Sequence, residues 1–127
     1  MNEQSAFPES VPTRAAAENA SGPRYRVDSF IVPAASRDEF LARVQDAHTI
    51  LRQQDGFLQD MILEQQSGPG AYNIVTLVEW ASAEVVDRVS EAVTRRYAEI
   101  GFDRNASLAR LGITADIATY ARIPAFG

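Results

Sequence analysis

The chain predicts strands from stretches rich in β-branched and aromatic residues, and helices from apolar residues at helical spacing between them. The stretch 72–81 is unusual, because the strand that it predicts is apolar on both faces. Val75 and Leu77 point to one side of that strand. The other side carries Ile74, Thr76, Val78 and Trp80. A sheet with one face in water alternates apolar and polar positions, so we expect something to cover the second face of this strand.

Three further strands are expected at 24–32, 57–66 and 113–123. Pro33 ends the first of them, because proline has no N–H to give to a neighbouring strand. Residues 67–70, Ser-Gly-Pro-Gly, predict a tight turn, so the second and third strands form a hairpin.

Helix boundaries are marked by capping residues and glycines. Ser36 and Glu39 have the spacing of a capping box, which predicts that a helix starts at Ser36. Gly56 is the predicted stop of this helix. An inward face follows at Phe40, Leu41, Val44, Ala47, His48 and Leu51. The caps and stops of a second and a short third helix are predicted at Ser82, Gly101, Asp103 and Gly112.

The order of these elements is β-α-β-β-α-β, with one small extra helix before the last strand. That order is typical of the ferredoxin-like α+β fold, a four-stranded antiparallel sheet with its helices on one face. Right-handed crossovers place strands 24–32 and 72–81 side by side in the middle. The helices leave the other face of the sheet open.

A second copy of the chain is the cover that we expect for the open face. Two such sheets packed face to face form a homodimer with two-fold symmetry. Burying even about 300 Å² of apolar surface per chain is worth roughly 7 kcal/mol before the costs of association. A single copy would leave that surface in water.

Composition narrows the classes of function. The 127 residues suit one domain, and they carry a net charge of −5 without a cluster of Lys or Arg, so we expect no nucleic-acid partner. The absence of Cys excludes disulfides and thiolate metal sites. No apolar run is long enough to span a bilayer and no secretory signal is evident, so we expect a cytoplasmic protein without a membrane partner.

Residues 1–23 differ in composition from the rest. They are rich in Ala, Ser, Pro, Glu and Asn and poor in large apolar residues. We therefore expect a flexible or partner-packed N-terminal arm at 1–23 and a single folded domain at 24–127.

Three segments of that domain resemble the antibiotic biosynthesis monooxygenase (ABM) superfamily of dimeric α+β barrels. They are the strand 27–33 with Arg-Asp-Glu-Phe at 37–40, Asp-Gly-Phe at 55–57, and the strand 75–82 that ends in Val-Glu-Trp-Ala-Ser. The resemblance covers about residues 24–123. It implies a dimeric barrel, and the family includes cofactor-independent oxygenases of aromatic polyketides, quinol oxygenases and haem-degrading enzymes.

The resemblance draws attention to three residues. Trp80 stands where haem-degrading relatives keep a Trp, although a core or strand-end aromatic also explains it. The iron ligand of those relatives is a His ten residues later, and this chain has Ser90 there. Haem degradation by that mechanism is therefore disfavoured. Tyr97 lies on the same helix face, and its hydroxyl is expected to reach a pocket together with Ser90.

The candidate proton acceptors are His48 and Asp28. His48 is the only histidine and lies on the inward face of the first helix, where it is either a proton acceptor or a structural side chain bonded to a neighbour. Asp28 lies within a central strand, where a carboxylate needs a partner such as Arg26 or Arg122. Arg96, near a helix end, is a further candidate for substrate binding.

Two functions fit these features. The first is a cofactor-independent monooxygenase that acts on a small quinol, phenol or polyketide-like aromatic, with no metal site and no bound cofactor. His48 or Asp28 would take the proton, and Trp80, Tyr97, Ser90 and Arg96 would bind the substrate. The alternative is a non-catalytic dimeric module that binds a small ligand or serves as an accessory subunit.

Overall fold

The fold is known from a computed structural model that describes residues 22–126. The arm predicted at 1–23 lies almost wholly outside the described residues. The elements are β1 (Arg24–Ile31), η2 (Ala34–Ser36), α2 (Arg37–Leu51), β2 (Phe57–Glu64), β3 (Ile74–Trp80), α3 (Ala83–Ile100), α4 (Arg104–Leu111), β4 (Thr114–Tyr120) and η3 (Pro124–Phe126). This order confirms the predicted β-α-β-β-α-β pattern with one extra helix.

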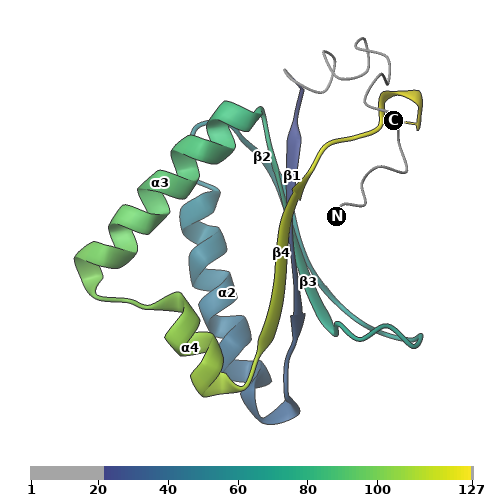
Figure 1. The fold of residues 1–127 in the computed structure, drawn as a ribbon, viewed down its shortest axis with the longest axis vertical. Helices are drawn as coiled ribbons and strands as arrows, with labels where there is room; N and C mark the ends of the chain where they lie inside the picture. Colours follow the sequence, from purple (N-terminus) through teal and green to yellow (C-terminus); the bar gives the residue numbers. More distant parts are fainter. Residues whose placement is uncertain (1–21, 127) are drawn as a thin grey trace, which may run out of the picture.

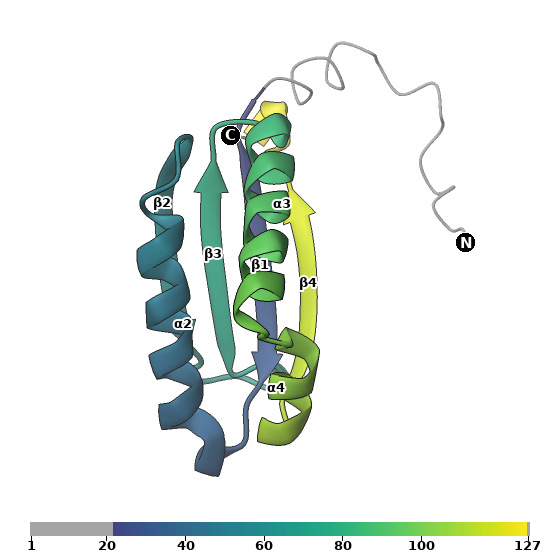
Figure 2. The same cartoon turned by 90° about the vertical axis from the view of Figure 1, so that its left-hand side faces the viewer.

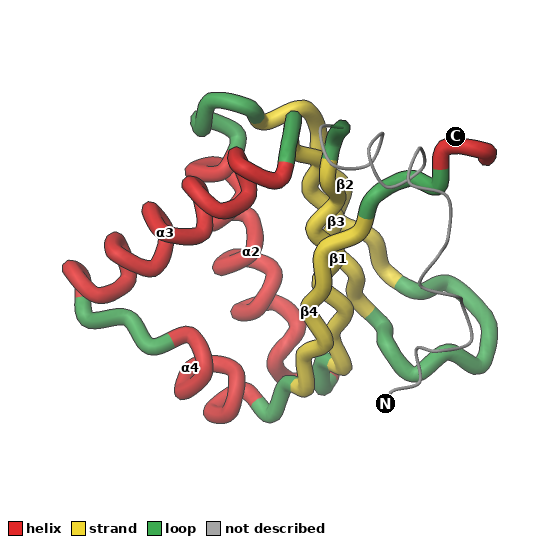
Figure 3. Tube along the Cα trace, turned by 45° about the horizontal axis from the view of Figure 1, so that its top comes forward, coloured by secondary structure: helices red, strands yellow, loops and turns green. Residues whose placement is uncertain are grey.

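The four strands form one sheet in the order β2-β3-β1-β4, and every neighbouring pair is antiparallel. The prediction that the first and third strands occupy the middle is confirmed. Helices α2, α3 and α4 all lie on one side of the sheet, and the other side carries none of them (Figures 1 and 2). Figure 3 shows the helices separated from the sheet as a second layer.

Two of the predicted helix caps are present. The Ser82 hydroxyl accepts a hydrogen bond from the Val85 N–H at 3.2 Å, and an Asp103 carboxylate oxygen accepts one from the Ala106 N–H at 3.0 Å. Gly101 ends α3 in the left-handed conformation, at a φ of 69° that glycine adopts without strain.

The predicted capping box and stop of the first helix are wrong. The Ser36 hydroxyl donates to the Leu111 carbonyl at 2.6 Å, and Glu39 instead binds Arg110, so neither side chain caps α2. The helix ends at Leu51, before the expected stop at Gly56. Gly56 is required for a different reason: its φ is +92°, and a Cβ there would lie 2.6 Å from a Val85 methyl carbon.

A β-bulge sets which side chains of β2 face the helices. Phe57 pairs with Trp80 and Gln59 pairs with Glu79, so Leu58 is an extra residue in the strand. Beyond the bulge the alternation is shifted by one position. Asp60 and Ile62 therefore face the helices, whereas Met61 and Leu63 face the open side.

The core consists of two separate clusters between helices and sheet. The larger contains Phe30 and Phe40, whose rings meet edge to face at 4.8 Å, and it extends to Ile74 and Leu111. The smaller is built on Val78, Trp80 and Val89. Between the two clusters, the helix-covered side of the sheet carries charged residues of β1.

Candidate functional site

A cavity of about 750 Å³ lies between the helices and the sheet, a volume in the range of small-molecule sites. Its floor comes from β1 and β3, and its walls from α2, α3, α4 and the α3–α4 loop. Five of the six site residues predicted from the sequence line it: Asp28, His48, Trp80, Ser90 and Tyr97.

His48 is bonded to a carboxylate that the sequence analysis missed. Its side chain is only 6 % exposed, and its Nδ1 lies 2.9 Å from Oδ2 of Asp60 on β2. The same carboxylate oxygen accepts a hydrogen bond from Arg52 Nε at 2.8 Å. Asp60 thus joins the end of α2 to the sheet beneath it.

The ionisation of Asp60 fixes the tautomer of the imidazole. Burial opposes the charged form of Asp60, but hydrogen bonds from His48 and Arg52 and the positive charge of Arg52 outweigh it and lower the pKa of Asp60 below its usual value. An ionised carboxylate only accepts hydrogen bonds, so Nδ1 of His48 must carry the proton. In the neutral ring, Nε2 is then the nitrogen with a free lone pair, which is the group that a proton acceptor needs.

Asp28 faces the helices, because its neighbours across the sheet are Thr76 and Ile117 and because it lines the cavity. Its carboxylate accepts a hydrogen bond from Arg26 Nε at 2.9 Å, and Nη2 of Arg104 on α4 lies 3.7 Å from its other oxygen. The predicted pairing with Arg26 is confirmed. Arg122 does not take part: it donates to the Tyr25 hydroxyl.

Apolar side chains form one end of the cavity. The buried Trp80 indole packs edge to face on the ring of Phe57 at 5.8 Å between centroids. Val78 and Val89 complete this wall. His48 lies above the same end, because its partner Asp60 pairs with Val78 in the sheet.

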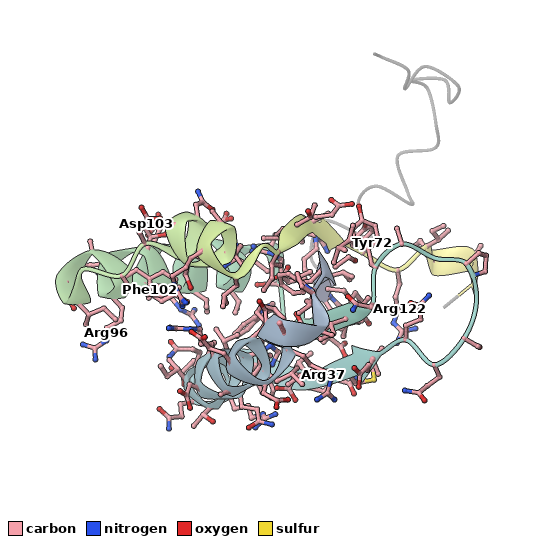
Figure 4. The ribbon with its side chains drawn as sticks, turned by 90° about the horizontal axis from the view of Figure 1, so that it is seen from below. Arg37, Tyr72, Arg96, Phe102, Asp103 and Arg122 are labelled. Atoms are coloured by element: carbon pink, nitrogen blue, oxygen red, sulfur yellow. The ribbon has the colours of Figure 1, made fainter. Side chains whose placement is uncertain are left out.

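An aromatic pair from the α3–α4 junction forms another wall. The rings of Tyr97 and Phe102 meet edge to face at 4.9 Å, and the Arg43 guanidinium of α2 lies over the Phe102 ring at 5.9 Å. Seen from below the molecule, Phe102 lies on the α2 side of the α3–α4 junction (Figure 4). Tyr97 therefore has its predicted place on the cavity wall.

The remaining two predicted residues differ in placement. Ser90 lines the cavity, although much of its surface is exposed. Arg96 is exposed, does not line the cavity, and extends away from it in Figure 4. The structure thus does not bring Arg96 together with the other five residues.

Five charged residues of this cavity region were not predicted from the sequence as site residues: Arg26, Arg43, Asp60, Asp103 and Arg104. Arg26 could have been found, because it shares a strand face with Asp28. Asp60 could not, since the bulge at Leu58 reverses the alternation of β2. Helical spacing could have found Arg43, which stands three residues after Phe40 and four before Ala47. Arg104 likewise stands four residues before Leu108, which lines the same cavity.

Residues 22–126 contain neither a candidate metal site nor a candidate membrane-spanning helix. Within residues 22–126, no three His, Cys, Asp or Glu side chains are grouped so that they could hold a metal ion. None of the helices in that part of the chain is long and apolar enough to cross a membrane.

Comparison with known proteins identifies the family to which this chain belongs. Residues 25–94, more than half of the chain, match the family model described as antibiotic biosynthesis monooxygenase. A search of curated proteins found no match.

Solved structures with the same fold include the following three. A candidate monooxygenase from Shewanella loihica PV-4 is 18% identical with a TM-score of 0.62, over 81% of this chain and 96% of its own. SnoaB, a cofactor-independent oxygenase from Streptomyces nogalater, is 17% identical with a TM-score of 0.59, over 79% and 92%. A haem-degrading protein from Mycobacterium tuberculosis is 17% identical with a TM-score of 0.52, over 80% and 91%. At these identities the likeness shows the fold alone.

Proposed function

The chain belongs to the antibiotic biosynthesis monooxygenase family, and we propose that it is a cofactor-independent monooxygenase that oxidises a small aromatic substrate in the cavity. The observation that carries this proposal is the His48–Asp60 pair at the apolar end of the cavity. The structurally similar SnoaB is described as a cofactor-independent oxygenase, which also supports it.

His48 is the proton acceptor in this proposal. Asp60 holds the imidazole with Nδ1 protonated, so Nε2 is available to take a proton from a phenol or from an anthrone-type CH₂ group. The negative charge of Asp60 then stabilises the imidazolium that forms, as an orienting carboxylate does. Asp28 is less suited to this role, because two arginines already engage its oxygens.

Deprotonation makes the substrate its own reductant. An anthrone carbanion gives one electron to O₂, and recombination of the two radicals forms a C–O bond to a peroxide. Loss of water from that peroxide leaves a ketone, so CH₂ plus O₂ becomes C=O plus H₂O. The substrate supplies all the electrons in this balance. The protein supplies a proton acceptor and a cavity that shields the carbanion from water.

The size and lining of the cavity suit a fused aromatic ring system. Trp80 and the Tyr97–Phe102 pair present aromatic faces and edges, with which flat rings pack well. A volume of about 750 Å³ accommodates two or three fused rings with substituents.

We also propose that the chain forms a homodimer through the open face of its sheet. The family fold is a dimeric α+β barrel. One row across the open face is apolar in all four strands, at Met61, Leu77, Val27 and Ala118. Met61 and the nearby Leu63 are 43% and 49% exposed in the single chain, so a partner sheet has apolar surface to bury.

Oxygen consumption with a panel of anthrones, quinols and phenols tests the proposed reaction. We expect uptake of one O₂ per substrate by the purified protein with no added cofactor. The matched control is the His48→Ala, Asp28→Ala double variant, whose folding is checked by its melting temperature. A panel that gives no turnover above this variant would overturn the proposal. A ligand that raises the melting temperature without forming product would favour a binding module instead.

A further inference from the structure

Three arginines from three different elements line the same cavity. Arg26 lies on β1, Arg43 on α2 and Arg104 at the start of α4. The chain as a whole is acidic, with a net charge of −5. Guanidinium groups gathered at a cavity in an acidic protein point to a ligand with negative charge.

The three guanidinium groups differ in how closely they pair with carboxylates. Arg26 makes a close bond to Asp28 at 2.9 Å, whereas Arg104 reaches the same carboxylate only at 3.7 Å. Arg43 shares one oxygen of Glu39 with Arg110, at 3.3 Å against 2.6 Å for Arg110. Arg43 and Arg104 therefore keep hydrogen-bond donors available for a ligand.

The acidic groups at the cavity do not cancel this positive charge. The lining contains two carboxylates, and one of them, Asp103, accepts the Ala106 N–H as the cap of α4. The other, Asp28, faces both Arg26 and Arg104. Within residues 22–126, the shared and more distant Glu39 is the only carboxylate that Arg43 pairs with, and its guanidinium also lies over the Phe102 ring.

Two of the arginines lie across the cavity floor from the proton acceptor: Arg26 on β1, and Arg104, which reaches Asp28 on the same strand. Arg43 lies on α2 with His48, five residues before it, or about 7.5 Å along the helix axis. Asp60, the partner of His48, pairs with Val78 on β3, and Val78 pairs with Arg26 on β1. Asp60 and Arg26 are therefore two strand spacings of 4.7–4.9 Å apart, or about 10 Å in all. Two or three fused rings span such a distance.

We propose that the substrate is an aromatic acid, whose carboxylate is bound by Arg43 and Arg104 while its oxidised ring lies at His48 and Trp80. Planar guanidinium groups match the geometry of a carboxylate and form charge-assisted bonds with it. This inference rests on the proposed function for the part that concerns the oxidised ring. Its claim about charge is tested by binding alone.

Two probes of equal shape separate charge from ring binding: 2-naphthoate and its neutral amide, 2-naphthamide. Isothermal titration of the full chain at pH 7 measures both dissociation constants. We expect 2-naphthoate to bind about tenfold more tightly than the amide, the effect of one or two hydrogen bonds to a charged group. Equal affinities, or no binding of either probe, would overturn the inference.

Variants with opposite expected effects guard against simple loss of structure. Arg43→Gln and Arg104→Gln are expected to weaken 2-naphthoate about tenfold each and to leave 2-naphthamide within twofold. Asp28→Asn removes the competing carboxylate and is expected to tighten 2-naphthoate about fivefold. Arg95→Gln is the matched control, because Arg95 is exposed and lies outside the cavity lining.

The outcomes also separate this inference from the proposed function. Selective binding of 2-naphthoate that Arg104→Gln abolishes supports the inference even where no aromatic is oxidised. Turnover of a neutral anthrone by a protein that binds both probes alike overturns the inference and leaves the monooxygenase function standing. An affinity for 2-naphthoate that Asp28→Asn fails to raise, and that neither arginine variant lowers, also overturns it.

Discussion

The two faces of the sheet depart from the usual distribution of polar and apolar residues in the middle of the sheet. The face beneath the helices carries charged groups in its middle, Arg26 and Asp28, with the His48–Asp60 pair beside them. The open face carries an apolar row that contains Leu77. A sheet in a simple two-layer domain would be apolar under its helices and polar toward water.

This difference teaches that each face is made for contact with something other than the helices or water. The covered face is hollow, and Arg26 and Asp28 pair with each other at its cavity. The open face has its own buried polar group: Glu79 accepts hydrogen bonds from Tyr25 and Gln59, at 3.0 Å and 2.6 Å. A ligand suits the first face, and a second sheet suits the other.

The largest expected effect comes from a charge placed in the middle of the open face. Leu77→Asp puts a carboxylate between Met61 and Val27, where a partner sheet would leave it without water. We expect the dimer to weaken by about a thousandfold or more, or about 4 kcal/mol. Sedimentation velocity over a range of concentrations measures this change.

Ile100→Asp is the control for that experiment. Ile100 is 54% exposed, but it belongs to α3 in the helix layer. We expect the same added charge there to leave the dimer intact. Equal weakening by both substitutions would show that the open face is not the interface.

Substitution of Asp60 tests the contribution of the polar residues on the sheet face beneath the helices. Asp60→Ala removes the carboxylate that binds Nδ1 of His48. Because the His48 side chain is only 6 % exposed, its N–H is then buried without a hydrogen-bond partner. We expect the free energy of unfolding to fall by about 1–3 kcal/mol, measured by urea denaturation. The matched variant is Glu64→Ala on the same strand, whose ion pair with Arg37 is exposed and contributes little.

The Asp60 carboxylate also predicts the direction in which the stability of the folded chain changes with pH. The pKa of Asp60 is lower in the folded chain than the 3.8 of an unperturbed Asp, so its stabilising effect is present above pH 3.8. That effect is lost as the pH falls through the lower, folded value. We expect the stability gap between the wild-type chain and Asp60→Asn to shrink as the pH falls below 3.8. A gap that stayed unchanged over that acidic range would contradict this pairing.

The smallest expected effect is that of Glu79→Gln on the open face. The carboxylate accepts hydrogen bonds at both oxygens, whereas an amide offers only one acceptor oxygen to Tyr25 or Gln59. We expect a loss of about 0.5–1.5 kcal/mol in unfolding free energy, with the dimer retained. Thermal unfolding compared with Gln59→Ala, which removes one of the two donors, checks the size of the effect.

The fold followed from sequence because its signals are local. The doubly apolar strand around Leu77, the turn at 67–70 and the Ser82 and Asp103 caps each act within a few residues. The capping box at Ser36 failed because a tertiary partner, the Leu111 carbonyl, competes for the hydroxyl. Such long-range competition leaves no trace in the spacing of residues.

The candidate site was predicted only in part, for the same reason. His48 and Trp80 lie on faces that simple periodicity assigns, and both line the cavity. Asp60 was missed because one extra residue, Leu58, shifts the alternation of β2, and a bulge has no reliable sequence signal. Arg104 reaches Asp28 only through the path of α4 across the end of the sheet, which residue spacing does not specify.

Oxygen uptake by the wild-type chain and by His48→Asn tests the central claim most directly. Asn keeps an amide that can bond Asp60 but has no atom in the place of Nε2. With 1,8-dihydroxy-9-anthrone at pH 7, and after subtraction of the uncatalysed rate, we expect the variant to be at least about a hundredfold slower than the wild-type chain. A His48→Asn chain that keeps the wild-type rate would contradict the role of His48 as the proton acceptor.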